Sequence, residues 1–194
     1  MAQVKLQAVH YKGAAPAVTA ATTAIDLPFI KRTLANGLTV ILSEDHSTPI
    51  VHLALWYHVG SKNEKPGRTG FAHLFEHMMF KGSKNVGPQE HANRINDVGG
   101  FLNAGTNFDY TFYWQTVPIN ALDMVLWLES DRMGHLLGAI DQPKLDEQRG
   151  VVQNEKRQGE NQPYGQVWTK LNQALYPEGH PYHHSVIGSM ADLN

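Results

Sequence analysis

The sequence predicts an α+β fold in which helices cover an antiparallel sheet. Two alternating apolar stretches with a turn between them occupy residues 29–45, a third apolar stretch follows at residues 49–61, and helical periodicity dominates the second half of the chain. Strands first, mixed elements next and helices last is an order typical of a sheet covered by helices. We therefore expect an extended arm over residues 1–28 and one folded domain over residues 29–194.

Composition and one turn mark the beginning of the fold. Residues 13–28 are rich in small side chains and contain two prolines, as extended linkers often do. Within residues 29–45, Asn36 and Gly37 separate two alternating apolar stretches, which is a strong short-range signal for a β-hairpin. The stretch 49–61 predicts a third strand.

The later elements follow from glycine boundaries and apolar spacing. A helix is expected from Gly70 to about Lys81, and a second helix after Pro88 that ends at two glycines. Residues 101–117 are rich in aromatic residues and threonine and predict a strand or a tight pair of strands. Further helices are expected over residues 120–137 with Asn120 as the N-cap, from about Pro143 to Gln158, and over residues 164–177.

Charge and hydropathy exclude several classes of function. Sixteen Lys and Arg residues nearly balance eighteen Asp and Glu residues, and no basic cluster is present, so nucleic acid is not an expected partner. No apolar run approaches the roughly 20 residues that span a bilayer, so no membrane span is expected. The chain has no cysteine, so any bound metal must be held by His, Asp or Glu.

The stretch GFAHLFEHMMFKG, residues 70–82, carries the candidate chemistry. His73 and His77 stand four residues apart, so in a helix both imidazoles can reach one zinc ion. Glu76 lies at the edge of the same face, where it could act as general base toward a zinc-bound water. The pattern is HxxEH, the inverse of the common HExxH. It arises by chance in roughly three sequences per hundred, so the motif alone leaves a chance arrangement open.

A zinc site of this kind needs a third protein ligand. Glu155 lies in a predicted helix, one turn after Val151 and Val152, on the side that we expect to face the core. A carboxylate there is costly to bury unless a cation meets it. From the residues alone, a solvated carboxylate paired with a Lys or Arg remains the alternative.

Several segments together resemble the pitrilysin/insulinase family of zinc endopeptidases, the inverzincins, which includes mitochondrial processing peptidase and insulin-degrading enzyme. In that family somewhat over seventy residues separate the last His from the third ligand, and here the separation is 155 − 77 = 78. The similar segments are LANGLTVILSED, GSKNEKPGRTGFAHLFEHMMFKGS, NDVGGFLNAGTNFDYTFYWQTVP and RGVVQNEKRQ. The similarity runs from about residue 30 to the end of the chain.

The resemblance implies a zinc-dependent endopeptidase that cleaves peptides or unfolded polypeptide segments. It assigns His73, His77 and Glu155 as ligands of Zn²⁺ and Glu76 as the general base.

The resemblance also implies substrate contacts. A family segment that pairs with the substrate backbone by strand addition falls on Asn103 and Ala104. Phe80 is a candidate for the substrate pocket, with core packing as the alternative.

One position departs from the family pattern. Family members usually carry a second Glu seven residues before the third ligand, and Gln148 stands there. Glu147 is adjacent, but it lies about 80° further round the helix and cannot replace that residue. Gln148 would orient a ligand by hydrogen bonding and attract the metal more weakly than a carboxylate. We therefore expect a zinc affinity below the family norm.

The family also implies that the domain is incomplete. Residues 183–194 predict the start of a helix capped by Ser189, and the family domain normally continues with this helix and at least one more strand. Family enzymes need a second related domain or subunit to close the substrate chamber. The compartment is not encoded in these residues; from the family, a bacterial periplasm is expected first and mitochondria second.

Two alternatives to an active peptidase remain. The first is a catalytically weak or non-catalytic subunit or fragment that binds peptide or a partner, although such subunits typically lose the HxxEH residues, which are intact here. The second is a zinc module without proteolytic activity.

Overall fold

The computed structural model describes residues 27–193. The predicted arm over residues 1–28 lies almost entirely outside them. The chain forms two compact units, one that ends at Ser47 and one that begins at Thr48. The extent of a single domain from residue 29 onward stays a prediction.

The first unit contains a β-hairpin. Strand β1 (Ile30–Thr33) pairs antiparallel with β2 (Thr39–Leu42). The amide of Gly37 donates to the carbonyl of Leu34 (2.9 Å), and the amide of Leu34 donates to the carbonyl of Leu38 (2.8 Å). Gly37 has φ of 88°, a conformation that costs glycine least. The hairpin predicted from the Asn-Gly pair is confirmed, with a longer loop than a two-residue turn.

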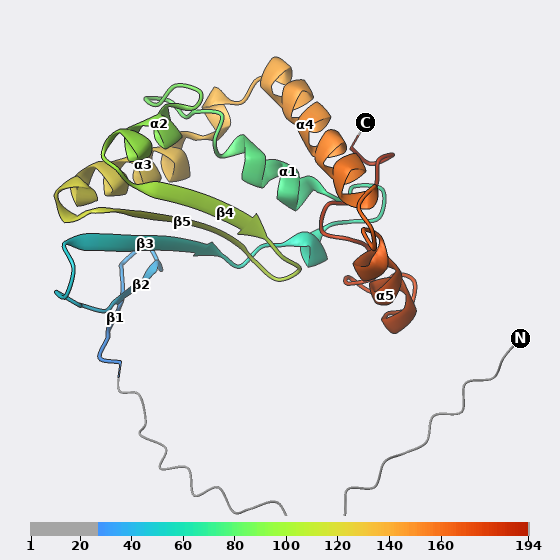
Figure 1. Ribbon diagram of the computed structural model, residues 1–194, viewed down its shortest axis with the longest axis horizontal. Coiled ribbons are helices and arrows are strands. Elements are labelled where there is room, and N and C mark those ends of the chain that lie inside the picture. The colour runs from blue at the N-terminus through green and yellow to red at the C-terminus, as the bar shows by residue number, and fades with distance from the viewer. Residues whose placement is uncertain (1–26, 194) are drawn as a thin grey trace, which may run out of the picture. The chain divides into compact units, whose positions relative to one another are not determined.

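The second unit is built on a three-stranded antiparallel sheet with the order β3-β5-β4 (Figure 1). The strands are β3 (Ile50–Tyr57), β4 (Phe101–Thr106) and β5 (Thr111–Pro118). Residues 101–117 therefore form a tight pair of strands. Because side chains alternate along a strand, one face of β5 is buried through Thr111, Tyr113, Gln115 and Val117.

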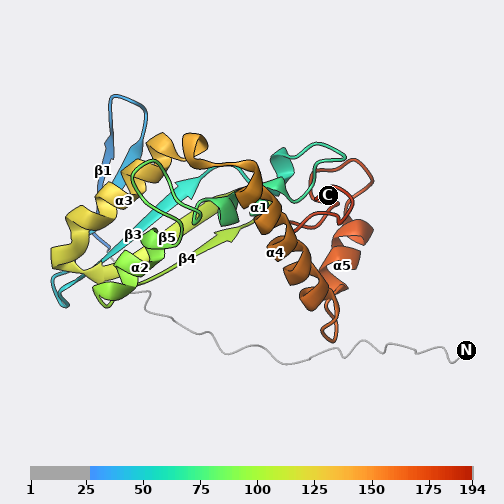
Figure 2. The same cartoon turned by 90° about the horizontal axis from the view of Figure 1, so that it is seen from above.

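Helices cover one face of this sheet (Figures 1 and 2). The chain order is η1 (Ser61–Asn63), α1 (Phe71–Met78), α2 (Glu90–Asp97), η2 (Ile119–Ala121), α3 (Leu122–His135), η3 (Leu137–Ala139), α4 (Gln142–Glu160) and α5 (Val167–Leu175). This arrangement confirms the predicted α+β fold. Among the described residues, no helix has the length and apolar character needed to cross a membrane.

Two of the three buried clusters among the described residues hold most of the helices in place. The larger cluster lies between α2, α3 and the sheet, and its buried members are Val86, Ile95, Val117, Ala121, Val125 and Leu128. A smaller cluster joins α1, α4 and the C-terminal turn through Leu74, Val152 and Leu193, each of which is fully buried. The smaller cluster fixes α1 against α4.

The predicted cap of α3 is wrong. The chain enters α3 through the 3-10 turn Ile119–Ala121, so the N-cap position falls on Ala121 instead of Asn120. Ala121 has no side-chain cap hydrogen bond. The extra turn shifts the start of the helix beyond the residue whose side chain could have capped it.

The predicted cap near the C-terminus has the expected geometry. The Ser189 hydroxyl accepts the amide of Asp192 (3.1 Å), which is the contact an N-cap serine makes with the third residue of a helix. The α1 helix ends at Met78, a few residues before the predicted Lys81.

Candidate metal centre

The helix that carries HxxEH begins without a capping side chain of its own. Its N-cap, Gly70, has φ of 90° and makes no side-chain cap hydrogen bond. The carboxylate of Glu64 takes this role: Oε2 accepts the amide of Gly70 (2.9 Å), and Oε1 accepts the amide of Ala72 (2.7 Å). Amides at a helix start have no partner within the helix, and they carry the positive end of its dipole. Glu64 therefore stabilises the first turn of α1.

Residues near the C-terminus hold the same end of α1. The Asp192 carboxylate accepts both the amide (2.9 Å) and the hydroxyl (2.6 Å) of Thr69. The Thr69 hydroxyl in turn accepts the amide of Ser189 (3.0 Å). A Cβ atom built on Gly70 would lie 2.6 Å from the carbonyl oxygen of Ile187. The start of α1 is thus enclosed by a second, distant segment.

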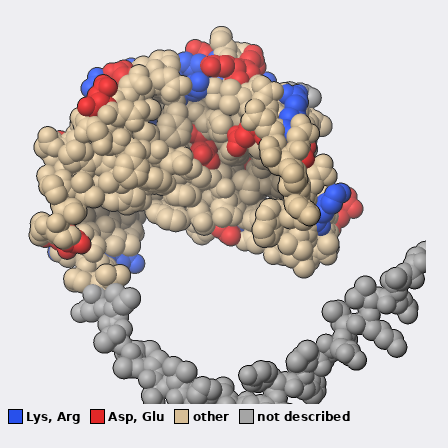
Figure 3. Space-filling model, in the orientation of Figure 1, with Lys and Arg blue, Asp and Glu red and all other residues tan. Residues whose placement is uncertain are grey.

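Helices α1 and α4 bring the three predicted metal ligands together. Nε2 of His73 lies 3.7 Å, and Nε2 of His77 lies 3.4 Å, from the same atom, Oε2 of Glu155. The two imidazole centroids are 4.7 Å apart and the rings are nearly perpendicular, at 82°. All three ligand atoms lie within 4.8 Å of one another. In the space-filling view, acidic atoms lie in a hollow at the place where Figure 1 shows α1 and α4 (Figure 3).

The spacing of these atoms fits a shared metal ion. Tetrahedral zinc with N and O ligands at about 2.0–2.1 Å places its ligand atoms about 3.3 Å apart. A direct N–H···O hydrogen bond spans about 2.7–3.2 Å, which both of the His–Glu distances exceed. Two imidazoles and one carboxylate are also a donor set that catalytic zinc uses. The group therefore fits zinc in chemistry and in spacing.

The environment of His73 favours its neutral form. Burial lowers the pKa of this imidazole, while the Glu155 carboxylate acts in the opposite direction. The neutral imidazole is the form that binds metal ions. Nδ1 of His73 is buried and has no hydrogen-bond partner among the described residues. Glu155, in contrast, is 49% exposed, so the group opens toward solvent on the α4 side.

Glu76 lies beside the three predicted ligand residues but is not one of them. Its side chain is 9% exposed. Oε2 accepts the hydroxyl of Thr106 at 2.5 Å, and Thr106 is the last residue of β4. The sheet therefore fixes the orientation of this carboxylate. No sequence pattern singled out Thr106, because the contact joins two elements that are distant in the chain.

On α4, neighbouring side chains take different directions. Gln148 is buried at 3% exposure, two helical turns before Glu155, and its Nε2 has no hydrogen-bond partner in the described part of the chain. Glu147 instead lies on the exposed side, with Oε1 3.3 Å from Nζ of Lys81. The role of Gln148 in orienting a ligand stays a prediction.

The predicted substrate residues lie on two elements. Asn103 is exposed and Ala104 is half-buried on β4, an edge strand of the described sheet, and the amide of Ala104 donates to Oδ1 of Asn103 (2.9 Å). Phe80 follows α1 and packs in a small cluster with Tyr113. Its ring lies 5.5 Å from the guanidinium carbon of Arg132. Phe80 thus serves packing, and its contact with substrate stays a prediction.

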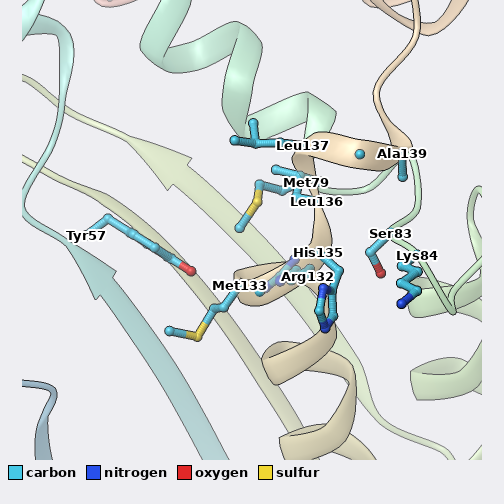
Figure 4. A pocket seen from close by; sticks show the side chains of 12 residues that line it. Tyr57, Met79, Ser83, Lys84, Arg132, Met133, His135, Leu136, Leu137 and Ala139 are labelled. Atoms are coloured by element: carbon cyan, nitrogen blue, oxygen red, sulfur yellow. The ribbon is translucent and has the colours of Figure 1, made fainter. Parts of the chain in front are cut away.

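A cavity of about 730 Å³ lies beyond the C-terminal end of α1 (Figure 4). Tyr57 reaches in from β3 opposite the last turn of α3, which contributes Arg132 and His135. Arg132 is paired with Glu129, at 2.5 Å between Nη2 and Oε1. Neither the two ligand imidazoles nor Glu155 lines this cavity, so it is separate from the candidate metal centre.

Most of the chain matches a known family of peptidases. Residues 39–188 match the insulinase family, peptidase family M16. The chain belongs to this family. Zinc protease PqqE from Helicobacter pylori is 35% identical over 163 residues, which are 83% of this chain and 36% of that relative. The family membership predicted from HxxEH and the accompanying segments is confirmed.

Solved M16 structures share the fold. The crystal structure of a protease from Helicobacter pylori superposes with a TM-score of 0.81 at 34% identity, over 86% of this chain and 40% of that chain. The periplasmic protease PqqL from Escherichia coli superposes with a TM-score of 0.76 at 26% identity, over 87% of this chain and 19% of that one. The chain thus spans at most about 40% of the length of these relatives.

Proposed function

We propose that this M16 chain is the zinc-binding part of an endopeptidase that hydrolyses peptides or unfolded polypeptide segments. The observation that carries the proposal is the approach of Nε2 of His73 and Nε2 of His77 to one oxygen of Glu155. These three side chains would hold Zn²⁺. The name of the zinc protease relative from Helicobacter pylori supports the choice of metal.

The chain's own residues would supply the proton transfers. Zinc, when bound, supplies a Lewis acid that polarises the scissile carbonyl and lowers the pKa of a water molecule to about 7. Glu76 takes a proton from the attacking water and later gives it to the leaving amine. The hydrogen bond from Thr106 to Glu76 holds the carboxylate in one orientation before substrate arrives.

The substrate would bind as an added strand on β4. Among the described strands, β4 pairs with β5 on one side only. The Asn103 side chain accepts the amide of Ala104, which gives this amide a partner until a peptide pairs there. At the end of the same strand, Thr106 contacts Glu76. A peptide that pairs along β4 would therefore pass the general base.

The complete enzyme would need more than this chain. Because the chain spans 36% of one relative and 40% of another, we propose that a second related domain or subunit completes the substrate chamber. We propose a periplasmic setting first, since PqqL is a periplasmic protease. A mitochondrial setting is the second proposal.

Substitution of Glu76 tests the peptidase proposal. Glu76→Gln removes the base and leaves the three ligands in place, so zinc content should equal that of the wild type. Hydrolysis of a fluorogenic peptide, measured with zinc and with a candidate second domain added, should fall by at least about 100-fold. Glu160→Gln, which changes an exposed glutamate paired with Lys156, is the control and should retain activity.

Two results would contradict the proposal. Hydrolysis that persists in Glu76→Gln would exclude Glu76 as the base. A wild-type chain that binds zinc but hydrolyses no peptide, alone or with the second domain, would favour the non-catalytic alternative.

A further inference from the structure

Glu64 is a buried carboxylate outside the group of residues assigned to chemistry so far. Its side chain is 5% exposed. Burial raises the pKa of this carboxyl, and the amides of Ala72 and Gly70 oppose that shift. Burying a carboxylate is costly unless hydrogen bonds compensate. Here the compensation comes from the first turn of α1, where both carboxylate oxygens accept backbone amides.

The direction of the first turn of α1 determines the positions of the two histidines on this helix. The helix has eight residues, and His73 directly follows Ala72, whose amide donates to Glu64. A change in the direction of this turn would also displace His77, one turn further along. Zinc tolerates deviations of only about 0.2 Å in its bond lengths. A small rotation of α1 would therefore separate the imidazoles from Glu155.

Helix α2 offers a contrast within the same unit. Its N-cap, Gln89, also makes no side-chain cap hydrogen bond. There the carboxylate of Glu90 accepts the amide of Gly87 (2.6 Å). The contact is of the same chemical kind as the one at α1, but α2 carries none of the proposed ligands and no general base. Of these two contacts, therefore, only the one at α1 can affect the positions of the proposed zinc ligands.

We propose that Glu64 is a positioning residue of the metal centre, which sets the start and direction of α1 and so orients His73 and His77 toward Glu155. This inference rests on the proposed zinc site, because it explains how the chain holds two of its ligands. Nδ1 of His184 lies 3.8 Å from Oε2 of Glu64, so a second side chain faces the carboxylate from the C-terminal segment.

The test compares Glu64→Gln and Glu64→Ala with the control Glu90→Gln. Zinc affinity is measured by competition with a chelator, at a temperature where circular dichroism shows every variant folded. We expect Glu64→Gln to weaken zinc binding by about tenfold, Glu64→Ala to weaken it further, and Glu90→Gln to leave it unchanged. In the metal-free protein, the amides of residues 72–74 should exchange with solvent faster in the Glu64 variants only.

The outcomes separate this inference from the proposed function. A Glu64→Gln protein with a lower melting temperature but wild-type zinc affinity would overturn the positioning role, and so would an equal loss of affinity in Glu90→Gln. If Glu64→Ala does not fold, Glu64→Gln, which has nearly the same shape, decides the question. A wild-type chain that binds no zinc would overturn the proposed function and, with it, the inference built on it.

Discussion

Gln148 is the residue at which the resemblance predicts a departure from the family pattern. It is buried on α4, seven residues before Glu155, and its Nε2 has no hydrogen-bond partner among the described residues. A neutral amide adds no negative charge near the proposed metal, so Glu155 is left as the charged ligand. We therefore expect the strength of zinc binding to depend on this position as well as on the ligands.

We predict that Gln148→Glu strengthens zinc binding and weakens the metal-free fold. The added charge should raise zinc affinity by about tenfold, measured by chelator competition. A buried carboxylate without a partner should lower the free energy of unfolding of the metal-free protein by about 1–3 kcal/mol, measured by urea denaturation. Gln158→Glu adds the same charge at an exposed position of α4. It should change neither the zinc affinity nor the free energy of unfolding. An unchanged zinc affinity in Gln148→Glu would show that Gln148 does not influence the metal.

At this scale, the sequence reveals residues whose partners are close in the chain. His73, Glu76 and His77 are recognisable because their spacing is the period of a helix. Glu155 needed the resemblance to a family, since no local pattern links it to α1. Glu64 was missed because its partners are backbone amides. A helix start at a glycine was the available signal, because some other group must then accept those amides.

Among the elements, α1 begins at a close backbone contact between Gly70 and the segment that contains Ile187. Gly70 combines a φ of 90° with a backbone oxygen 2.6 Å from the place where a Cβ would lie. The oxygen belongs to Ile187, in the segment whose Leu193 packs with Leu74 and Val152. The helix that bears the motif is thus held at its start by backbone packing and along its length by a small apolar cluster.

Two glycine substitutions separate conformation from packing. Gly67 also has positive φ, at 77°, but no atom lies within 4 Å of a Cβ placed on it. We expect Gly67→Ala to lower the free energy of unfolding by about 1–2 kcal/mol, the cost of the left-handed conformation. Gly70→Ala should cost about 1–3 kcal/mol more because of the close contact. Urea denaturation of both variants measures the difference. An equal loss of unfolding free energy in the two variants would mean that the segment around Ile187 moves to accommodate the added Cβ atom.

Elements defined by local signals were predictable, and elements shaped by their neighbours were less so. The hairpin follows from the Asn-Gly pair. The aromatic and β-branched residues of 101–117 predict extended structure, and the structure decides between one strand and a pair. The cap at Asn120 was wrong because the 3-10 turn Ile119–Ala121 intervenes. Propensity alone does not encode such a turn, which depends on how the chain leaves β5.

At the scale of the whole molecule, the chain has two compact units, and the proposed site lies within one of them. The three proposed ligands, His73, His77 and Glu155, and the proposed base Glu76 all belong to the unit that begins at Thr48. The chain covers 40% or less of the solved relatives, so binding of zinc and turnover of peptide can be separated experimentally. The proposed zinc site uses only residues described above, whereas we expect efficient hydrolysis to require the proposed second domain.

Zinc content of the purified chain tests the central claim most directly. Wild type is compared by elemental analysis with His77→Ala, with Glu155→Gln and with the control Glu147→Gln, which changes an exposed neighbour on α4. The wild type and the control should each hold about one zinc per chain, and the two ligand variants should hold far less. A wild type without zinc after reconstitution, or full zinc content in both ligand variants, would contradict the three-ligand site.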